Sequence, residues 1–349
     1  MSLGEAWMDI PIVSDFRRPY IDVDMEFFRD IITSDMKWAM CAIATHIGLF
    51  GIIDDSGMTV SEIAKRLGAE ELPMRMLLDF LSGFRIIRKE KDRYYATSFS
   101  KMKRLFGPYY GEESVQFNPF WSRFIRILRG EKLKPLQPIH RWWSPEEQRR
   151  FIVLAICGEF QRTLELLERE NVFGGAKKML DIGGGHGLYS IGFCSIYPEL
   201  RSTIFDLPGV VDLAAENIRR YGMENKVEIL VGNALVDDYP SGYDVAFMSD
   251  VTFKMSDAKI VVEKAYECLR SGGRFVIKDI VPCNDWGEAP YALSHEISQL
   301  IIAGSVEEYG EPPPTMREYT EIMRNVGFRD TKILGEITRG WTSLIVGYK

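Results

Sequence analysis

Hydrophobic residues in the first third of the chain recur at helical spacing. Residues 35–50 (DMKWAMCAIATHIGLF) are apolar on nearly every side, which predicts a helix that is buried all round. A Thr-x-x-Glu capping box begins a second helix over 59–67, and a third helix over 73–84 carries leucines on one face. Residues 84–98 then form two short strand patterns around a turn. Three helices followed by a hairpin predict a winged helix-turn-helix.

The pattern changes in the second half to apolar strands that alternate with amphipathic helices. A loosely patterned connector over 105–144 precedes a capped helix over 145–170, which bridges into this half. The alternation predicts a doubly wound parallel sheet, and a short turn joins the last two strands as an antiparallel hairpin at its edge. In chain order the predicted strands are KMLDIG, STIFDLP, KVEILVGN, YDVAFMSD, GRFVIKDI, TKILGEI and TSLIVGY.

These elements predict an α/β protein with a Rossmann-like seven-stranded sheet and a mostly α-helical N-terminal domain. We place the winged-helix domain at 1–104, the helical connector and bridging helix at 105–170, and the sheet domain at 171–349. A chain of 349 residues is long enough to bury a core in each of two domains.

Composition narrows the classes of function. The net charge of −7 argues against bulk affinity for nucleic acid. No apolar run approaches the roughly 20 residues of a membrane span, and the acidic start MSLGEAWMD lacks the features of a signal peptide. The five cysteines show no metal-ligand spacing, which is typical of free thiols in a reducing cytoplasm. We therefore expect a cytoplasmic protein with neither a membrane span nor a catalytic metal.

Candidate chemistry begins at a cluster of four glycines within residues 183–187. The stretch Asp-x-Gly-x-Gly-x-Gly follows the first predicted strand of the sheet, where doubly wound folds bind their ligands. It lacks both the GxGxxG spacing of a dinucleotide site and the Gly-Lys-Ser/Thr ending of a P-loop. The acid on the strand, Asp181, would repel a pyrophosphate but suits a ligand with an ammonium and a sulfonium group. S-adenosylmethionine has both groups, so the sequence predicts this cofactor.

Two further strand ends support the same cofactor. Asp206 ends the second strand about 20 residues past the loop, where a carboxylate can accept hydrogen bonds from both ribose hydroxyls. Asn233 ends the third strand and is placed to meet the adenine amino group. The alternative for Asp206 is a structural role, in which it only caps the turn before Pro208.

The chain from about residue 36 resembles the small-molecule O-methyltransferases of the plant caffeate type and their microbial relatives. IFDLP at 204–208 matches that family's second-strand signature, and the winged helix matches its dimerisation domain. The resemblance implies S-adenosyl-L-methionine as methyl donor, S-adenosyl-L-homocysteine as product, and a homodimer through the N-terminal domain. The family usually has Gly-Asp where this chain has Gly-Asn, and the amide can still meet adenine. The implied cofactor contacts are Asp181, Gly183, Gly185, Asp206, Leu207, Asn233, Ala234 and Ser249.

The sequence departs from the family at the catalytic base. The family follows its fourth strand with a stretch of the type His-Asp-Trp-Ser-Asp, whose histidine takes the proton from the acceptor hydroxyl, and here Phe253 holds that position. Three readings stay open. His295, in ALSHEIS, replaces the base; or positioning alone drives transfer, as in relatives that methylate carbon on large ring systems; or transferase activity has been lost. His295 could also be structural, or could ligate the metal of a tetrapyrrole.

The acceptor is expected to be a flat aromatic or polycyclic small molecule, because aromatic and methionine residues are frequent around the predicted pocket. Phe160, Phe253 and His295 are expected to line that pocket, with His295 as the catalytic candidate. A DNA-binding regulator is the competing class, since residues 85–104 hold eight basic residues against two acidic ones. The third helix, however, offers only Arg75 to a base edge, which favours dimerisation and no nucleic-acid partner.

Overall fold

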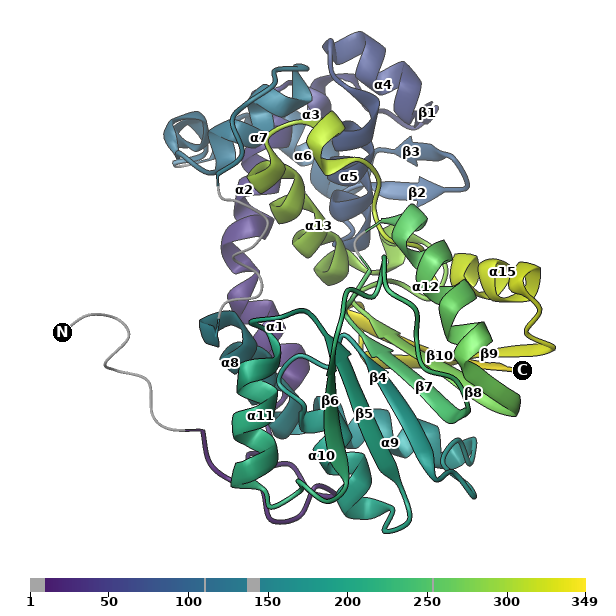
Figure 1. The fold of residues 1–349 in the computed structure, drawn as a ribbon. Helices are drawn as coiled ribbons and strands as arrows, with labels where there is room; N and C mark the ends of the chain where they lie inside the picture. Colours follow the sequence, from purple (N-terminus) through teal and green to yellow (C-terminus); the bar gives the residue numbers. More distant parts are fainter. Residues whose placement is uncertain (1–9, 110, 137–144, 253) are drawn as a thin grey trace.

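The C-terminal half of the protein is built on one twisted sheet. The computed structural model describes residues 10–109, 111–136, 145–252 and 254–349, and Figure 1 shows the arrangement. In these ranges the sheet has seven strands in the order β6-β5-β4-β7-β8-β10-β9, parallel from β6 to β8 and antiparallel at the final hairpin. This is the sheet that the sequence predicts. The strands are β4 (Lys178–Ile182), β5 (Arg201–Asp206), β6 (Val227–Val231), β7 (Tyr243–Ser249), β8 (Leu269–Asp279), β9 (Asp330–Thr338) and β10 (Thr342–Tyr348).

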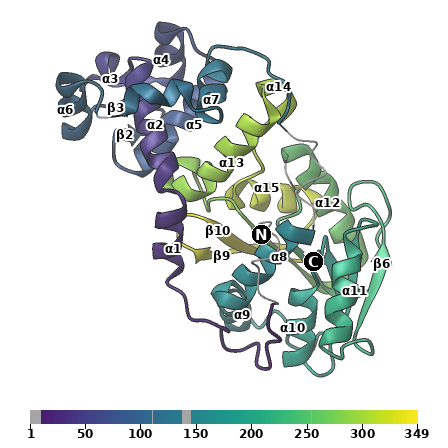
Figure 2. The same cartoon turned by 90° about the vertical axis from the view of Figure 1, so that its left-hand side faces the viewer.

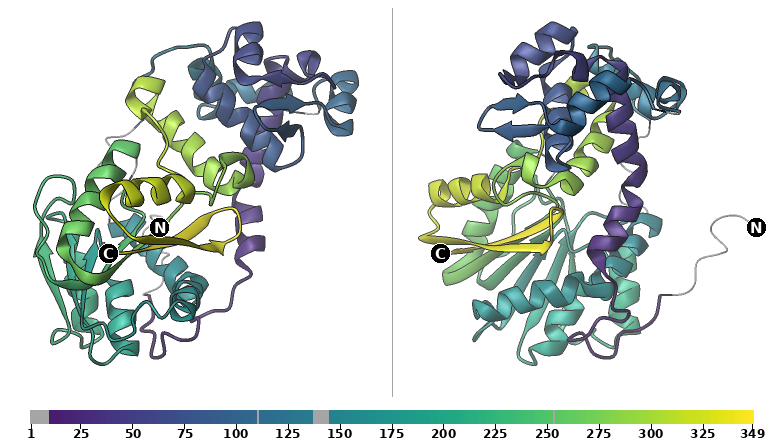
Figure 3. Two further views of the ribbon diagram at one scale, coloured as in Figure 1. Left: turned by 90° about the vertical axis from the view of Figure 1, so that its right-hand side faces the viewer. Right: turned by 180° about the vertical axis from the view of Figure 1, so that it is seen from behind.

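Both faces of the sheet are buried, which explains why its strands are apolar at successive positions. In β7, Val245 and Phe247 belong to the core under α9, α10 and α11, whereas Ala246 and Met248 belong to the core under α12 and α15. The two helical layers lie on opposite sides of the sheet (Figure 3). These helices are α9 (Phe160–Arg169), α10 (Leu188–Ile196), α11 (Val211–Arg220), α12 (Met255–Cys268) and α15 (Met316–Val326).

The N-terminal region contains the predicted helices and hairpin. Strands β1 (Met58–Thr59), β3 and β2 form a small antiparallel sheet beside the helices, and β3 (Arg93–Tyr95) pairs with β2 (Arg88–Glu90) around the predicted turn. The helices are α1 (Met25–Ile32), α2 (Ser34–His46), α3 (Leu49–Ile52), α4 (Val60–Leu67), α5 (Glu71–Gly83), α6 (Ser98–Phe106) and α7 (Trp121–Leu128), with a 3₁₀ turn η2 (Glu112–Phe117).

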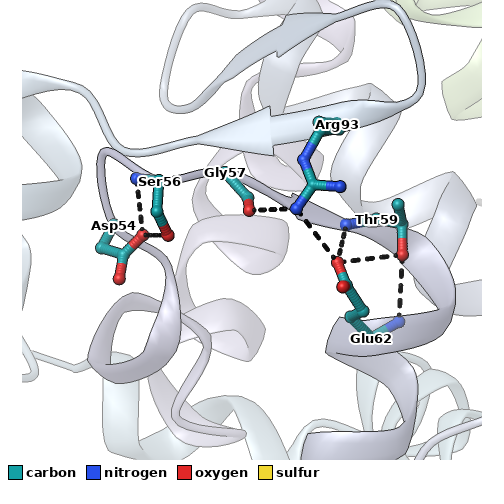
Figure 4. Close-up of polar contacts among 6 residues, drawn as sticks. All are labelled: Asp54, Ser56, Gly57, Thr59, Glu62 and Arg93. Carbon is teal, nitrogen blue, oxygen red and sulfur yellow. Dashed lines mark hydrogen bonds and ion pairs between the residues drawn. The ribbon is translucent and has the colours of Figure 1, made fainter.

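The start of α4 shows how local sequence sets an element boundary. The Glu62 amide donates to Thr59 Oγ1 at 3.3 Å, and the Thr59 amide donates to Glu62 Oε2 at 2.7 Å, which completes the predicted capping box (Figure 4). Arg93 of β3 donates to the carbonyl of Gly57 at 2.8 Å. The cap therefore satisfies two amides at the start of the helix, and Arg93, which also lies 3.5 Å from Glu62 Oε2, ties the hairpin to this helix.

The prediction that the first long helix is buried all round is wrong in part. Met40 and Ile43 of α2 lie in the core of the N-terminal region, where they meet side chains of the same chain. Trp38 is 39% exposed, and Asp35 and His46 are also exposed. The hydrophobic pattern alone could not show that Trp38 is exposed, because the pattern counts an aromatic ring as apolar whether or not other side chains cover it.

The bridging helix is interrupted near its middle. α8 (Pro145–Leu154) passes through one π-helical turn over 155–159 into α9, and Gly158 in that turn has φ 134°. Only glycine adopts this conformation readily, so the break is encoded at this residue. The expected single helix over 145–170 is thus two helices joined at a bend next to Glu159.

The two halves of the chain exchange segments. Residues 10–23 pack on the sheet domain, where the ring of Phe16 lies 5.4 Å from that of Phe160 and the Tyr20 amide donates to the Ile156 carbonyl. In the opposite direction, α13 (Pro290–Ala303) leaves the sheet domain and packs against α5 and α7 in the N-terminal core (Figure 2). Short helices η5 (Trp286–Glu288) and α14 (Val306–Tyr309) flank it. The predicted boundaries therefore do not separate the two cores.

Arg29 marks the point where α1 meets the sheet domain. Its side chain is fully buried, and its guanidinium lies 4.9 Å from the ring of Tyr291 and 5.8 Å from that of Trp341. It also donates to the backbone carbonyls of Met25 and Arg339.

In the described ranges, no helix has the length and apolar character needed to cross a bilayer.

Candidate cofactor and acceptor site

The candidate site is a cavity at the carboxyl ends of β4, β5, β7 and β8. It measures about 1020 Å³ including its open mouth, and it lies where the strand order reverses between β4 and β7. Open parallel sheets bind ligands at this switch point. The α8–α9 junction and α13 complete the wall, so the cavity combines residues from the glycine loop, three other strand ends and two helical segments.

The glycine loop needs glycine for both conformation and space. Gly183 and Gly185 have φ of 65° and 50°, in the left-handed region. A Cβ atom on Gly183 would lie 2.4 Å from a methyl group of Val251, and one on Gly185 would lie 2.7 Å from Gln148 Oε1. The Gly185 amide donates to Asp206 Oδ2 at 2.8 Å. The loop is therefore held close to β5 and to the bridging helix.

Asp206 is placed to bind a ligand as well as to cap its own turn. Its two oxygens accept the amides of Gly185, at 2.8 Å, and Leu207, at 2.7 Å. A carboxylate has about four acceptor positions, so about two remain for hydroxyl groups in the cavity that Asp206 lines. Burial raises the pKa of this carboxyl, and the two backbone hydrogen bonds partly offset the increase. One side chain can therefore cap the turn before Pro208 and still accept hydrogen bonds from a ligand, so the two interpretations of Asp206 do not exclude each other.

Asp181 faces the same cavity from β4. It is buried, and Ser190 Oγ donates to its Oδ2 at 2.6 Å. Burial raises the pKa of Asp181 to about 7, with the Ser190 hydrogen bond acting in the opposite direction. A cationic group in the cavity would favour the ionised form. The loop, Asp206 and Asp181 therefore fit the ribose and ammonium groups of S-adenosylmethionine.

The other predicted cofactor contacts divide into two groups. Ser249 lines the cavity, whereas Leu207, Asn233 and Ala234 do not. Asn233 Oδ1 accepts the amide of Leu235 at 2.9 Å, so it is partly used in a local turn. The structure thus brings five of the eight predicted contacts into one cavity, and the other three are not part of its lining.

The predicted acceptor pocket is only partly supported. His295 lines the cavity, but Phe160 does not: it is 1% exposed, and its ring lies 5.1 Å from Phe193 and 5.5 Å from Tyr189. The prediction for Phe160 is therefore wrong, because this ring packs in the core against the aromatic rings of α10. Phe253 lies outside the described residues.

The described lining of the cavity differs from the aromatic and methionine lining that the sequence led us to expect. It contains no methionine or tryptophan, and its aromatic rings are Phe151 and Tyr189 beside two histidines. Carboxylates, amides and hydroxyls make up much of the remainder. The methionine-rich pocket expected from the sequence is thus absent from the described lining, in which residues with polar side chains outnumber those without.

The two cavity histidines differ in their surroundings. The Leu188 amide donates to His186 Nδ1 at 3.1 Å, so this imidazole faces the loop backbone. His295 Nε2 lies 3.0 Å from the amide nitrogen of Gln299. Burial lowers the pKa of each to about 4, and the charge of Asp250 partly offsets the decrease for both, while Lys278 lowers that of His186 further. Both rings are neutral at pH 7, which is the state in which an imidazole can accept a proton.

Sequence reasoning missed a charged cluster in the same cavity. Lys278 at the end of β8 is 2% exposed, and its ammonium lies 2.9 Å from Asp250 Oδ2 and 3.4 Å from Glu159 Oε2. Asp279 follows it, and burial raises the pKa of Asp279 to about 8. The rule that singled out Asp181 and Asp206, a charged residue at a parallel strand end, would also have found this cluster in FMSD and VIKD.

Comparison with known proteins gives a family and several relatives. A family model described as the O-methyltransferase domain matches residues 147–329. The bacteriochlorophyllide d C-20 methyltransferase of Chlorobaculum tepidum is 26% identical, over 86% of this chain and 90% of its own. The 3-hydroxy-5-methyl-1-naphthoate 3-O-methyltransferase of Streptomyces sahachiroi is 23% identical, over 92% of this chain and 94% of its own.

A solved structure shares the fold over nearly the whole chain. The O-methyltransferase family 2 protein from Planctomyces limnophilus, crystallised with apigenin, has a TM-score of 0.71 at 19% identity. The match covers 97% of this chain and 100% of that one. It includes the N-terminal helices as well as the sheet, so the two halves occur together in both proteins.

Removal of the Asp206 carboxylate should abolish cofactor binding. A saturating concentration of S-adenosylhomocysteine should raise the melting temperature of the wild-type protein by about 3–6 °C. Asp206→Ala should remove most of this shift, because the ribose loses its acceptor and the Gly185 amide its partner. Asp212→Ala, on the exposed side of α11, is the matched control and should keep the shift. A full shift in Asp206→Ala would reject this site for the cofactor.

The affinity for S-adenosylhomocysteine should rise with pH. Its ammonium favours ionised Asp181, whose pKa in the free protein is about 7. Binding therefore releases a proton below that pH, and the affinity at pH 7.5 should exceed that at pH 6 by roughly fivefold to tenfold. Isothermal titration at the two pH values measures this. Asp181→Asn should flatten the dependence, and an affinity that falls as pH rises would contradict the role of Asp181.

Proposed function

Since the chain belongs to the S-adenosylmethionine-dependent O-methyltransferase family, we propose that it methylates a hydroxyl group of a flat aromatic or polycyclic small molecule. It is a methyltransferase with S-adenosylmethionine as its cofactor. The observation that carries the proposal is that Asp181, Asp206 and His295 line one cavity. A methyl donor and an imidazole would therefore share the same enclosed space.

The residues of this chain divide the work between the two substrates. Bound S-adenosylmethionine supplies an electrophilic methyl group. Asp206 would hold its ribose hydroxyls and Asp181 its ammonium group, which leaves the α13 side of the cavity for the acceptor. A ring of the acceptor would pack on Phe151 or Tyr189, the described aromatic side chains of the lining.

His295 is proposed to take the proton from the acceptor hydroxyl. A free phenol has a pKa of about 10, so only about one molecule in a thousand is ionised at pH 7. As the new oxygen–carbon bond forms, the proton passes from the hydroxyl to the neutral imidazole and later to solvent. Burial lowers the pKa of this imidazole to about 4, and the nearby charge of Asp250 partly offsets the decrease. General-base assistance of this kind contributes about 10²–10⁴-fold.

Methyl transfer to carbon on a large ring system is the alternative. The Chlorobaculum tepidum relative is named for a C-20 methylation of a bacteriochlorophyllide. In that case His295 would orient a tetrapyrrole or quinone or ligate a tetrapyrrole's metal, and no base would be needed at position 253. The Streptomyces sahachiroi relative, named for a 3-O-methylation of a naphthoate, supports the hydroxyl acceptor.

The surroundings of α5 support an enzyme over a DNA-binding regulator. Asp79 on this helix is buried, and the amino group of Lys89 lies 2.9 Å from it. The helix also packs against α13, and Arg75 is one of its few exposed residues. A recognition helix needs a free face for the major groove, and α5 has little of one.

A homodimer through the N-terminal region is part of the proposal. Apolar side chains on α6 and in the segment after it are widely exposed, with Leu105 at 89%, Phe106 at 62% and Phe117 at 79%. A second group lies on α1, where Phe27 and Ile31 are exposed. Apolar patches of this kind mark contact surfaces in soluble proteins. We therefore expect a second copy of the chain to cover the α6 group and the α1 group.

Removal of the imidazole should slow methyl transfer without loss of cofactor. His295→Ala should lower kcat with 2-naphthol as acceptor by at least about tenfold and leave the affinity for S-adenosylhomocysteine unchanged. His46→Ala removes an exposed histidine of α2 and is the control. Phe253→His should not improve activity, because we expect the acceptor to pack on that ring. Full activity of His295→Ala would make positioning alone the better account.

Disruption of the α6 surface should produce monomers. Light scattering of the wild-type protein at low micromolar concentration should show a dimer, and Leu105→Glu should shift it to monomer, because a charge replaces an apolar contact. Val236→Glu changes a side chain that is 72% exposed in the other half of the chain and should leave the dimer intact. A monomeric wild-type protein would reject the proposed interface.

A further inference from the structure

Asp250 has one oxygen that the protein saturates and one that it leaves open. It directly follows β7, lines the cavity, and has φ 56°, which residues other than glycine adopt mainly at constrained sites. Ser249 Oγ and Lys278 Nζ both lie 2.9 Å from its Oδ2. Its Oδ1 is buried and has no hydrogen-bond partner among the described residues. A buried carboxylate oxygen in this state calls for a donor from a ligand.

The cluster around Lys278 carries an excess of negative charge. Its ammonium contacts two carboxylates, Asp250 at 2.9 Å and Glu159 at 3.4 Å, so the three ionised side chains sum to a charge of −1. One carboxylate would be enough to neutralise a buried lysine. The second comes from the bend of the bridging helix, which also lines the cavity.

The other titratable groups of the lining do not cancel this charge. Burial lowers the pKa of His186 and His295 to about 4, so both are neutral at pH 7. Burial raises the pKa of Asp279 to about 8 and that of Glu296 to about 7. A carboxyl group is either neutral or negative, so neither residue can offset the negative charge of the cluster. Among the described residues of the lining, Lys278 is the sole cation. The acids on the cofactor side contribute no positive charge.

On the premise of the proposed methyl transfer, we infer that Asp250 selects the acceptor. Its Oδ1 accepts a hydrogen bond from an O–H or N–H group of the acceptor, and the Asp250–Lys278–Glu159 cluster excludes acceptors that carry a carboxylate on the reacting ring system. The acceptor class is thus a neutral or cationic flat ring with at least one donor. A carboxylate would lose hydration and meet like charge in this cavity, and both effects oppose its binding. Lys278 is a positioning residue that holds Asp250 through Oδ2.

A matched pair of probes tests this selection. 2-Naphthol and 3-hydroxy-1-naphthoate differ only in the carboxylate, and each is titrated calorimetrically into the complex of the full chain with S-adenosylhomocysteine. The wild-type protein should bind 2-naphthol at least about tenfold more tightly. Asp250→Asn keeps the shape and removes the charge, so 2-naphthol should bind severalfold more weakly and its advantage should fall below about threefold.

Two further variants separate charge from folding. Glu159→Gln removes charge from the same cluster without a change in β7 and should also narrow the preference, chiefly by improved binding of the naphthoate. Asp238→Asn removes an exposed carboxylate and should change neither probe. The affinity for S-adenosylhomocysteine should stay within about twofold of wild type in all three variants, because the cofactor is assigned to Asp181 and Asp206.

Several outcomes would overturn the inference while the methyltransferase function stands. They are equal or tighter binding of the naphthoate by the wild-type protein, failure of both probes to bind at millimolar concentration, and a preference unchanged in both Asp250→Asn and Glu159→Gln. If Asp250→Asn weakens S-adenosylhomocysteine in place of 2-naphthol, Oδ1 serves the cofactor and the inference is also wrong. Failure of the proposed function itself is distinct, because the wild-type protein would then not bind S-adenosylhomocysteine.

Discussion

The hydrogen bond from the Gly185 amide to the Asp206 carboxylate is the contact on which the site depends. It joins the loop after β4 to the end of β5, at 2.8 Å and in a buried position. Gly185 has φ 50°, in the left-handed region that favours glycine, and a Cβ atom on it would lie 2.7 Å from Gln148 Oε1 of the bridging helix. Sheet edge, glycine loop and bridging helix are therefore fixed relative to one another. The cavity exists in the space that these three leave.

Buried charge governs what this space can bind. Carboxyl groups line it on both the cofactor and the acceptor side, and their pKa values are raised by burial where the protein offers few donors, as at Asp181 and Asp279. A cationic ligand next to such a group would favour its ionised form, because the opposite charge offsets the cost of burying the carboxylate. Lys278 differs, since two acids hold it in the charged state. We therefore expect ligand binding and proton binding to be linked at the carboxyl groups whose pKa is raised, as at Asp181 and Asp279.

The N-terminal region shapes the acceptor side of the site from within one chain. α13 carries His295 toward the cavity, while Leu293 and Ile297 of the same helix belong to the N-terminal core. Lys89 of the small sheet lies 2.8 Å from Asp285, just before η5 and the start of α13. Any shift of the N-terminal helices would therefore move the imidazole relative to the strand ends. This coupling explains why a region with winged-helix-like elements belongs in an enzyme.

The sequence alone was enough to predict those features that depend on interactions between residues close together in the chain. The strands, the capping box at Thr59 and the glycine loop depend on residues a few positions apart, so spacing was enough to predict them. Contacts between distant residues were decided only by tertiary structure. Phe160 packs in the core and not in the cavity, and Lys278 meets Glu159 across 119 positions of sequence. Periodicity tells which side of an element is apolar, but packing decides which partner that side meets, and only packing brings three charges from separate elements to one point.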